Sequence, residues 1–104
     1  LSRMLLAKDY IQQHFTKAVS LQDLALITGI SSFRLTRTFH HCFGVTPQQY
    51  QAALRMQEAQ KRLTDPSLSL TDIALGLGFH DLAAFSNQFK KYHQQTPSHF
   101  RKQL

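Results

Sequence analysis

Hydrophobic residues recur at helical spacing along most of the chain. The first predicted helix, residues 2–15, carries on one face Met4, Ala7, Ile11 and Phe15, with Leu5 beside them. The sequence has no long alternation of apolar and polar residues and no Asn-Gly hairpin turn, the patterns that indicate strands. The periodicity therefore predicts an all-α fold.

Short start and stop signals divide the chain into helices. Serine, threonine or aspartate precedes the expected helices as an N-cap, and glycine or proline marks the turns between them. None of the connections is long enough to split the chain, so residues 1–104 are expected to form one domain. About seven helices are expected, over residues 2–15, 20–28, 32–43, 47–63, 69–76, 82–92 and 97–102.

One stretch of sequence occurs twice, 49 positions apart. Residues 20–30, SLQDLALITGI, correspond to residues 69–79, SLTDIALGLGF. The correspondence then shifts by one residue and continues to two Thr-Pro pairs, at 46–47 and 96–97. Self-similarity of this kind indicates a repeated supersecondary unit. Each copy has the pattern of a short helix, a glycine-containing turn and a second helix, which is a helix-turn-helix.

Both copies hold the residue types that a helix-turn-helix needs at its turn. Ala25 and Ala74 are small where the two helices approach, and Gly29 and Gly78 permit the turn. The apolar residue after each glycine is expected to anchor the turn in the core. The sequence thus predicts a first helix-turn-helix over about 20–43, a linker helix over about 47–63 and a second helix-turn-helix over about 69–92.

The charge balance favours a polyanionic partner. Twelve Lys/Arg against six Asp/Glu give a net charge of +6, which attracts nucleic acid through its phosphates. No apolar run is long enough to span a membrane, and no secretory pattern opens the chain, so a cytoplasmic protein is expected. A single cysteine excludes an internal disulfide. The chain starts at Leu1, which suggests a fragment of a longer protein.

The sequence gives little support to an enzyme or a metal site. His40, His41 and Cys42 are consecutive, and consecutive helical side chains point about 100° apart, so they cannot converge on one ion. The remaining histidines are scattered, and neither a catalytic triad spacing nor a phosphate-binding glycine loop is present. We expect a non-enzymatic protein without metal or cofactor.

The second helix of the first copy is expected to present side chains to DNA. Arg37 is the strongest candidate for a base contact, since a guanidinium that forks onto guanine O6 and N7 gives about 1–3 kcal/mol of discrimination. Its alternative is a solvated surface arginine. Phe33 contacts a thymine methyl or is a partly buried turn residue, and the sequence leaves both open. The candidate set is Ser32, Phe33, Arg34, Thr36, Arg37 and His41.

The corresponding helix of the second copy is chemically quieter. Asn87 stands where Arg37 stands in the first copy and suits adenine, whereas Lys90 and Lys91 suit phosphate. Asp81 is expected to cap this helix. We therefore expect the first copy to read sequence more strongly. The candidate set is His80, Leu82, Ala83, Ser86, Asn87, Lys90 and Lys91.

Taken together, these residues resemble the DNA-binding domain of the AraC/XylS family of bacterial transcription regulators. The resemblance runs from about Tyr10 to Arg101 and is most specific over 20–29, 44–47, 54–59, 73–79 and 85–98. It implies two helix-turn-helix motifs joined by a helix, binding to double-stranded promoter DNA in successive major grooves, and transcription activation through RNA polymerase. It also implies a separate N-terminal effector-sensing or dimerisation domain.

The chain departs from the family pattern at two places. His93-Gln94-Gln95 replaces the aromatic-Gly pair that follows the second recognition helix in the family, and Leu82 and Ala83 stand where polar residues are usual. The fold is expected to survive both changes. Two other functions compete with specific DNA reading: a helix-turn-helix module that binds proteins, and a non-specific binder of nucleic acid.

Overall fold

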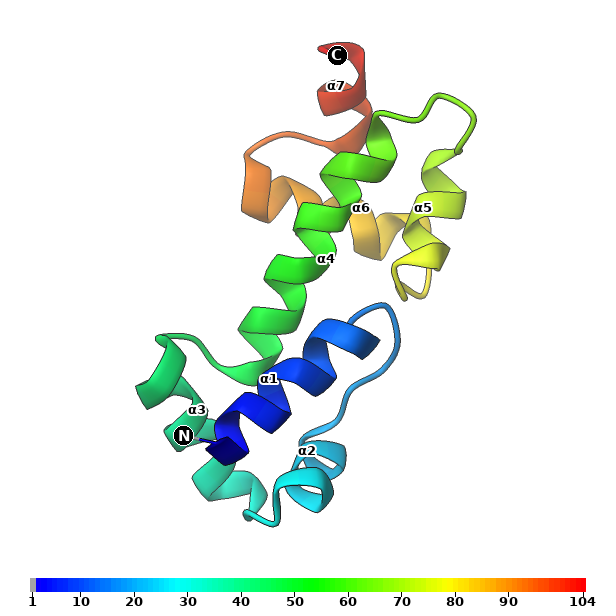
Figure 1. Ribbon diagram of the computed structural model, residues 1–104. Helices are drawn as coiled ribbons and strands as arrows, with labels where there is room; N and C mark the ends of the chain where they lie inside the picture. Colours follow the sequence, from blue (N-terminus) through cyan, green and yellow to red (C-terminus); the bar gives the residue numbers. More distant parts are fainter. Residues whose placement is uncertain (1) are drawn as a thin grey trace. The chain divides into compact units, whose positions relative to one another are not determined.

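The computed structural model describes residues 2–104, and these residues form seven α-helices and no strand (Figure 1). The all-α prediction and its seven helices are confirmed, with ends that differ by at most one residue. The first helix ends one residue earlier than expected, at His14. The helices are α1 Ser2–His14, α2 Leu21–Thr28, α3 Ser32–Phe43, α4 Pro47–Leu63, α5 Leu70–Gly76, α6 Leu82–His93 and α7 Pro97–Lys102. None of these helices is long and apolar enough to cross a membrane.

The chain divides into two compact units, with the boundary between Leu54 and Arg55. This boundary lies inside α4, so each unit contains one helix-turn-helix and one part of the linker helix. Each copy of the repeated sequence therefore has a core of its own.

The core of the first unit is built on α1, which packs against α2 and α3. Tyr50 and Leu54 of α4 pack against this core from the side. Leu5, expected near the apolar face of α1, is 49% exposed, because the buried stripe of that helix is narrower than predicted. The fully buried residues are Met4, Ala7, Ile11, Leu24, Leu35 and Phe39.

The core of the second unit is largely aromatic. Phe85 of α6 lies between Phe79 and Phe89, with ring centroids 5.4 and 5.8 Å apart, and Phe89 continues to Phe100 of α7 at 5.6 Å. Stacked and edge-to-face rings add to the apolar burial of such a core. Fully buried aliphatic residues complete it: Met56, Ala59, Leu63, Ile73, Ala74 and Leu77.

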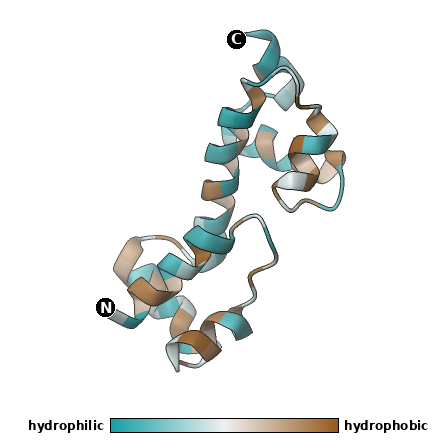
Figure 2. Ribbon diagram, turned by 45° about the vertical axis from the view of Figure 1, so that its right-hand side comes forward, coloured by the Kyte–Doolittle hydropathy of each residue, from teal (hydrophilic) through white to brown (hydrophobic). Residues whose placement is uncertain are grey.

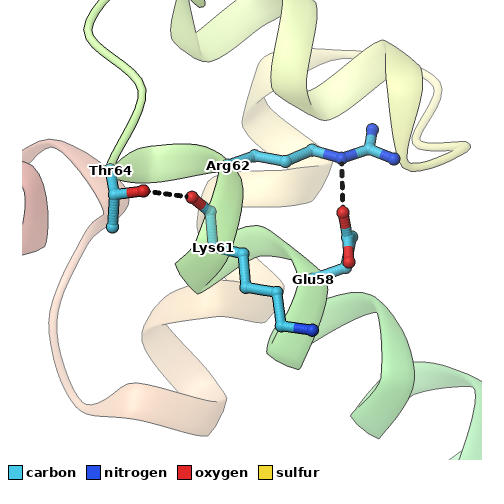
Figure 3. A network of polar contacts seen from close by, with 4 residues as sticks. All are labelled: Glu58, Lys61, Arg62 and Thr64. Atoms are coloured by element: carbon cyan, nitrogen blue, oxygen red, sulfur yellow. Dashed lines mark hydrogen bonds and ion pairs between the residues drawn. The ribbon is translucent and has the colours of Figure 1, made fainter.

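Polar residues cover most of α4 and fix its C-terminal end (Figure 2). In Figure 3, Arg62 Nε donates to Glu58 Oε2 at 3.1 Å, and the Thr64 hydroxyl donates to the carbonyl of Lys61 at 2.6 Å. Arg101 donates to the carbonyl of Leu63 at 3.1 Å. The bonds from Thr64 and Arg101 satisfy carbonyls that a helix end leaves without an intrahelical partner.

The glycine predicted at each turn has the backbone conformation that the turn requires. Gly29 has φ of 72° and donates its amide to the Ala25 carbonyl, and Gly78 has φ of 96°. The second turn has a different hydrogen-bond pattern, because Gly78 bonds to Leu75 and Phe79 bonds to Ala74, a Schellman motif. The prediction that these glycines permit the turns is confirmed.

The departure from the family pattern after α6 leaves the local fold intact. Gln94 follows α6 with φ of 64°, as Gly44 follows α3 with φ of 78°. His93 packs on Phe89 with ring centroids 4.4 Å apart, and Phe43 packs on Phe39 at 4.7 Å. Histidine therefore occupies the place of the aromatic residue, and glutamine adopts the conformation that favours glycine.

Candidate nucleic-acid interface

The second helix of each helix-turn-helix, α3 and α6, has the position that is called the recognition helix in this motif, and a side chain fixes where each one begins. The Ser31 hydroxyl accepts from the amide of Arg34 at 3.4 Å, and the Asp81 carboxylate accepts from the amide of Ala84 at 2.8 Å. The predicted capping role of Asp81 is confirmed. The Asp81 carboxylate is thus bound to a backbone amide at the start of α6.

The predicted contact residues of α3 divide into exposed and half-buried side chains. Phe33, Arg34, Arg37 and His41 are exposed, opposite the buried Leu35 and Phe39. Ser32 and Thr36 are half-buried, and the Thr36 hydroxyl donates to the carbonyl of Ser32 at 3.2 Å. Thr36 therefore directs its hydrogen back to its own helix.

Phe33 and Arg37 form the clearest contact on this surface. Phe33 is 72% exposed, which rules out the partly buried turn residue considered from the sequence. The guanidinium carbon of Arg37 lies 5.7 Å from the centroid of the Phe33 ring, within the range of a cation–π contact. One face of α3 thus presents a cation that rests on an aromatic ring.

Arg34 and Arg37 also line an open hollow on the surface. Only some of its lining residues were predicted from the sequence as DNA contacts. Thr38, His40 and Thr46 lie on its wall and were not predicted. His40 is three positions after Arg37, a spacing that places both side chains on neighbouring parts of one helix face. From this spacing alone, His40 could have been predicted to lie beside Arg37. The lining residues are Arg34, Thr36, Arg37, Thr38, His40, His41 and Thr46.

On α6 the predicted residues are mostly exposed but carry a different chemistry. Asn87 is exposed at the position that corresponds to Arg37, and Lys90 and Lys91 are exposed near the end of the helix. Exposed His80 and Ala83 accompany them, whereas Leu82 and Ser86 are half-buried. Among the predicted residues of α6, the exposed polar groups are thus one amide and two ammonium groups, and the first two residues of the helix are apolar.

Neither recognition helix contains an acidic residue. The sequences SFRLTRTFHHCF and LAAFSNQFKKYH hold arginine, lysine and histidine without aspartate or glutamate. Among residues 2–104, no three His, Cys, Asp or Glu side chains are grouped as metal ligands would be. Both helices thus have the charge that suits a polyanion.

Arg55 adds a cation beside the second helix-turn-helix. Its guanidinium carbon lies 5.2 Å from the centroid of the Phe79 ring, which follows the glycine of the turn. Burial lowers the pKa of Arg55 from its ordinary value, and arginine nevertheless keeps its charge in proteins. The contact ties α4 to the second turn within the same unit.

Comparison with known proteins identifies relatives for most of the chain. A family model described as a helix-turn-helix domain matches residues 24–103. An uncharacterized HTH-type transcriptional regulator of Staphylococcus aureus is 37% identical over 93 residues, which is 89% of this chain and 12% of the relative. The chain therefore spans about an eighth of the length of that relative.

Solved structures share the fold along nearly the whole chain. A transcriptional regulator from Chromobacterium violaceum, described as containing an AraC-type DNA-binding domain, aligns with a TM-score of 0.86 and 27% identity, over 98% of this chain and 91% of that one. The DNA-binding domain of AdpA, a global transcriptional factor solved in complex with a target DNA, aligns with a TM-score of 0.87 and 21% identity, over 95% and 89%.

Proposed function

The chain belongs to the AraC-type helix-turn-helix family, the DNA-binding domains of transcription regulators, and from this premise we propose that it recognises a specific sequence of double-stranded DNA. The observation that carries the proposal is the chemistry of the two recognition helices. Both are free of acidic residues, and each exposes a side chain suited to a base edge, Arg37 on α3 and Asn87 on α6. Arginine pairs with guanine and asparagine with adenine in the major groove.

Four other exposed side chains, all of them basic or titratable to a cation, are assigned to the DNA backbone. Lys90 and Lys91 on α6, and Arg34 and His41 on α3, hold phosphates and so position the helices without specifying sequence. The DNA-binding domain of AdpA, which has the same fold, was solved in complex with a target DNA, and this supports DNA binding by the fold. Each recognition helix enters one of two successive major grooves, about 34 Å apart along the duplex.

Selection from a random pool of duplexes, followed by sequencing, tests this function. The 104-residue chain is expected to enrich one asymmetric motif with two short conserved segments one helical turn apart. Enrichment that stays uniform across sequences would indicate a non-specific binder instead, and absence of any duplex binding would favour a protein-interaction module.

We also propose that the longer protein activates transcription from a promoter that holds this motif, through contact with RNA polymerase. In this proposal the protein binds promoter DNA in the bacterial cytoplasm, at the nucleoid. An N-terminal domain of the longer protein senses an effector or dimerises. A reporter gene downstream of the selected motif measures the outcome. Expression that rises with the full-length protein supports activation, and expression that falls identifies a repressor.

A further inference from the structure

We infer that Phe33 and Arg37 read one dinucleotide step together, a guanine next to a pyrimidine that carries a C5 methyl group. The inference rests on the proposed DNA binding and deepens it, since it assigns a base preference to one pair of residues. Thymine is the pyrimidine of ordinary DNA that meets the requirement, and 5-methylcytosine, the methylated form of cytosine, carries the same C5 methyl group.

The side chains of Phe33 and Arg37 lie against each other on α3. Phe33 and Arg37 are four residues apart on α3, a spacing that brings side chains together on one face of a helix. The Arg37 guanidinium lies over the Phe33 ring at 5.7 Å, and the ring is 72% exposed. The Phe33 ring thus restricts the positions of the Arg37 guanidinium. Most of the apolar surface of Phe33 stays in contact with water.

The chemistry of the major groove determines what such a pair can recognise. A guanidinium that forks onto guanine O6 and N7 lies close to the plane of that base pair. The neighbouring aromatic ring then faces the adjacent base pair, and it has no hydrogen-bonding atom to offer. The C5 methyl of a pyrimidine is the apolar group that base edges present in this groove. Phe33 therefore favours a methylated pyrimidine beside the guanine that Arg37 reads.

The second recognition helix provides an internal comparison. Ala83 and Asn87 of α6 correspond to Phe33 and Arg37, so the second copy has neither the ring nor the guanidinium. A dependence on the C5 methyl is consequently expected in only one segment of the recognised motif. That asymmetry identifies which segment α3 contacts.

Deoxyuridine substitution tests the inference directly, because it removes the methyl group and leaves every hydrogen-bonding group of thymine in place. Each thymine of the selected motif is replaced in turn, and the affinity of the 104-residue chain is measured. One replacement, beside a guanine, is expected to weaken binding about threefold to fivefold, the loss of one buried methyl. Cytosine and 5-methylcytosine compared at that position are expected to differ by a similar factor, in favour of the methylated base.

Three variants connect the methyl preference to Phe33. Phe33→Ala is expected to bind thymine and deoxyuridine duplexes equally, since alanine does not reach the methyl group. Phe33→Leu keeps an apolar contact and is expected to retain part of the preference. Leu75→Ala, which removes an apolar side chain that is 55% exposed on α5, is the matched control and should leave the thymine-to-deoxyuridine ratio unchanged.

The outcomes separate this inference from the proposed function. A selected motif without a thymine beside a guanine overturns the inference, and so does a ratio near one at every thymine. A preference that persists in Phe33→Ala assigns the methyl contact to another residue and also overturns it. Failure to select any motif overturns the proposed function, and the inference with it.

Discussion

Arg37 and Lys91 are exposed cations on two recognition helices, but their chemistry predicts different effects on recognition. A guanidinium forks onto two acceptors of one base, whereas an ammonium acts as a point charge. Arg37 is assigned to a guanine and Lys91 to a phosphate. The distinction between specifying and positioning therefore rests on single side chains.

Arg37→Ala is expected to relax specificity at one base pair, with about 1–3 kcal/mol of discrimination lost there. Lys91→Ala is expected to weaken every duplex by a similar factor. Competition binding against duplexes that change one base pair at a time measures both effects. If both variants lose affinity evenly across sequences, Arg37 does not read a base.

Gln94 is the one residue other than glycine with a positive φ among those described, and it offers a test of stability. A left-handed conformation costs a residue with a side chain about 1 kcal/mol, so Gln94→Gly is expected to raise the free energy of unfolding by up to about that amount. Denaturant titration of both proteins measures the difference.

Gly44 provides the reverse substitution as a control. A Cβ at Gly44 would meet no atom within 4 Å, so the effect of Gly44→Gln comes from its φ of 78° alone. A decrease in stability of similar size is expected. An unchanged midpoint in both variants would show that glutamine adopts this conformation without a cost.

Among whole elements, the helix caps of α2 and α4 differ from the corresponding caps of α5 and α7. At α2 and α4 the caps are reciprocal: Ser20 and Asp23 exchange two hydrogen bonds, at 3.0 and 3.1 Å, and so do Thr46 and Gln49, at 2.9 and 3.2 Å. In the second unit, the Ser69 and Thr96 hydroxyls each accept one bond, at 3.0 and 3.1 Å. Sequence spacing predicted both serine caps, but it did not distinguish reciprocal from one-sided bonding.

This difference predicts unequal effects of matched substitutions. Asp23→Ala removes a hydrogen bond to the Ser20 amide and is expected to destabilise α2 by about 1 kcal/mol more than Asp72→Ala destabilises α5. Amide hydrogen exchange of the two helices reports each effect separately. Equal losses of protection would show that the reciprocal bond contributes nothing measurable.

The sequence predicted the course of the helices better than the details of their faces. Caps, glycines and Thr-Pro pairs are local signals, so the helix ends agree within one residue. Burial depends on neighbours far along the chain. Met56 is buried without having been predicted, because α4 changes from one core to the other and its apolar stripe changes with it.

The candidate site shows the same limit. Periodicity placed Arg37 on the exposed side of α3, and the structure agrees. The four-residue spacing brings Phe33 and Arg37 to one face, but it does not determine that the guanidinium lies over the ring, or that the Thr36 hydroxyl bonds to its own helix. Such contacts depend on side-chain rotamers, which are chosen in the folded chain.

At the scale of the whole molecule, the net charge of +6 predicts a strong dependence of DNA binding on salt. Binding releases counterions from the duplex, so the logarithm of affinity falls linearly with the logarithm of salt concentration, by about 0.9 for each phosphate contacted. Lys90→Ala is expected to make this slope shallower by about one unit. Titrations over a range of salt concentrations measure the slope, and an unchanged slope would remove Lys90 from the phosphate contacts.

Both recognition helices have 12 residues, and each lies between a capping side chain and a residue with positive φ. Such equal frames make α3 and α6 comparable segments, because the cap, the length and the two buried positions correspond, Leu35 to Phe85 and Phe39 to Phe89. A chain with residues 32–43 copied into positions 82–93 is therefore expected to recognise a direct repeat of one half-site. The capped frame can stay constant while new operators are acquired, one twelve-residue segment at a time.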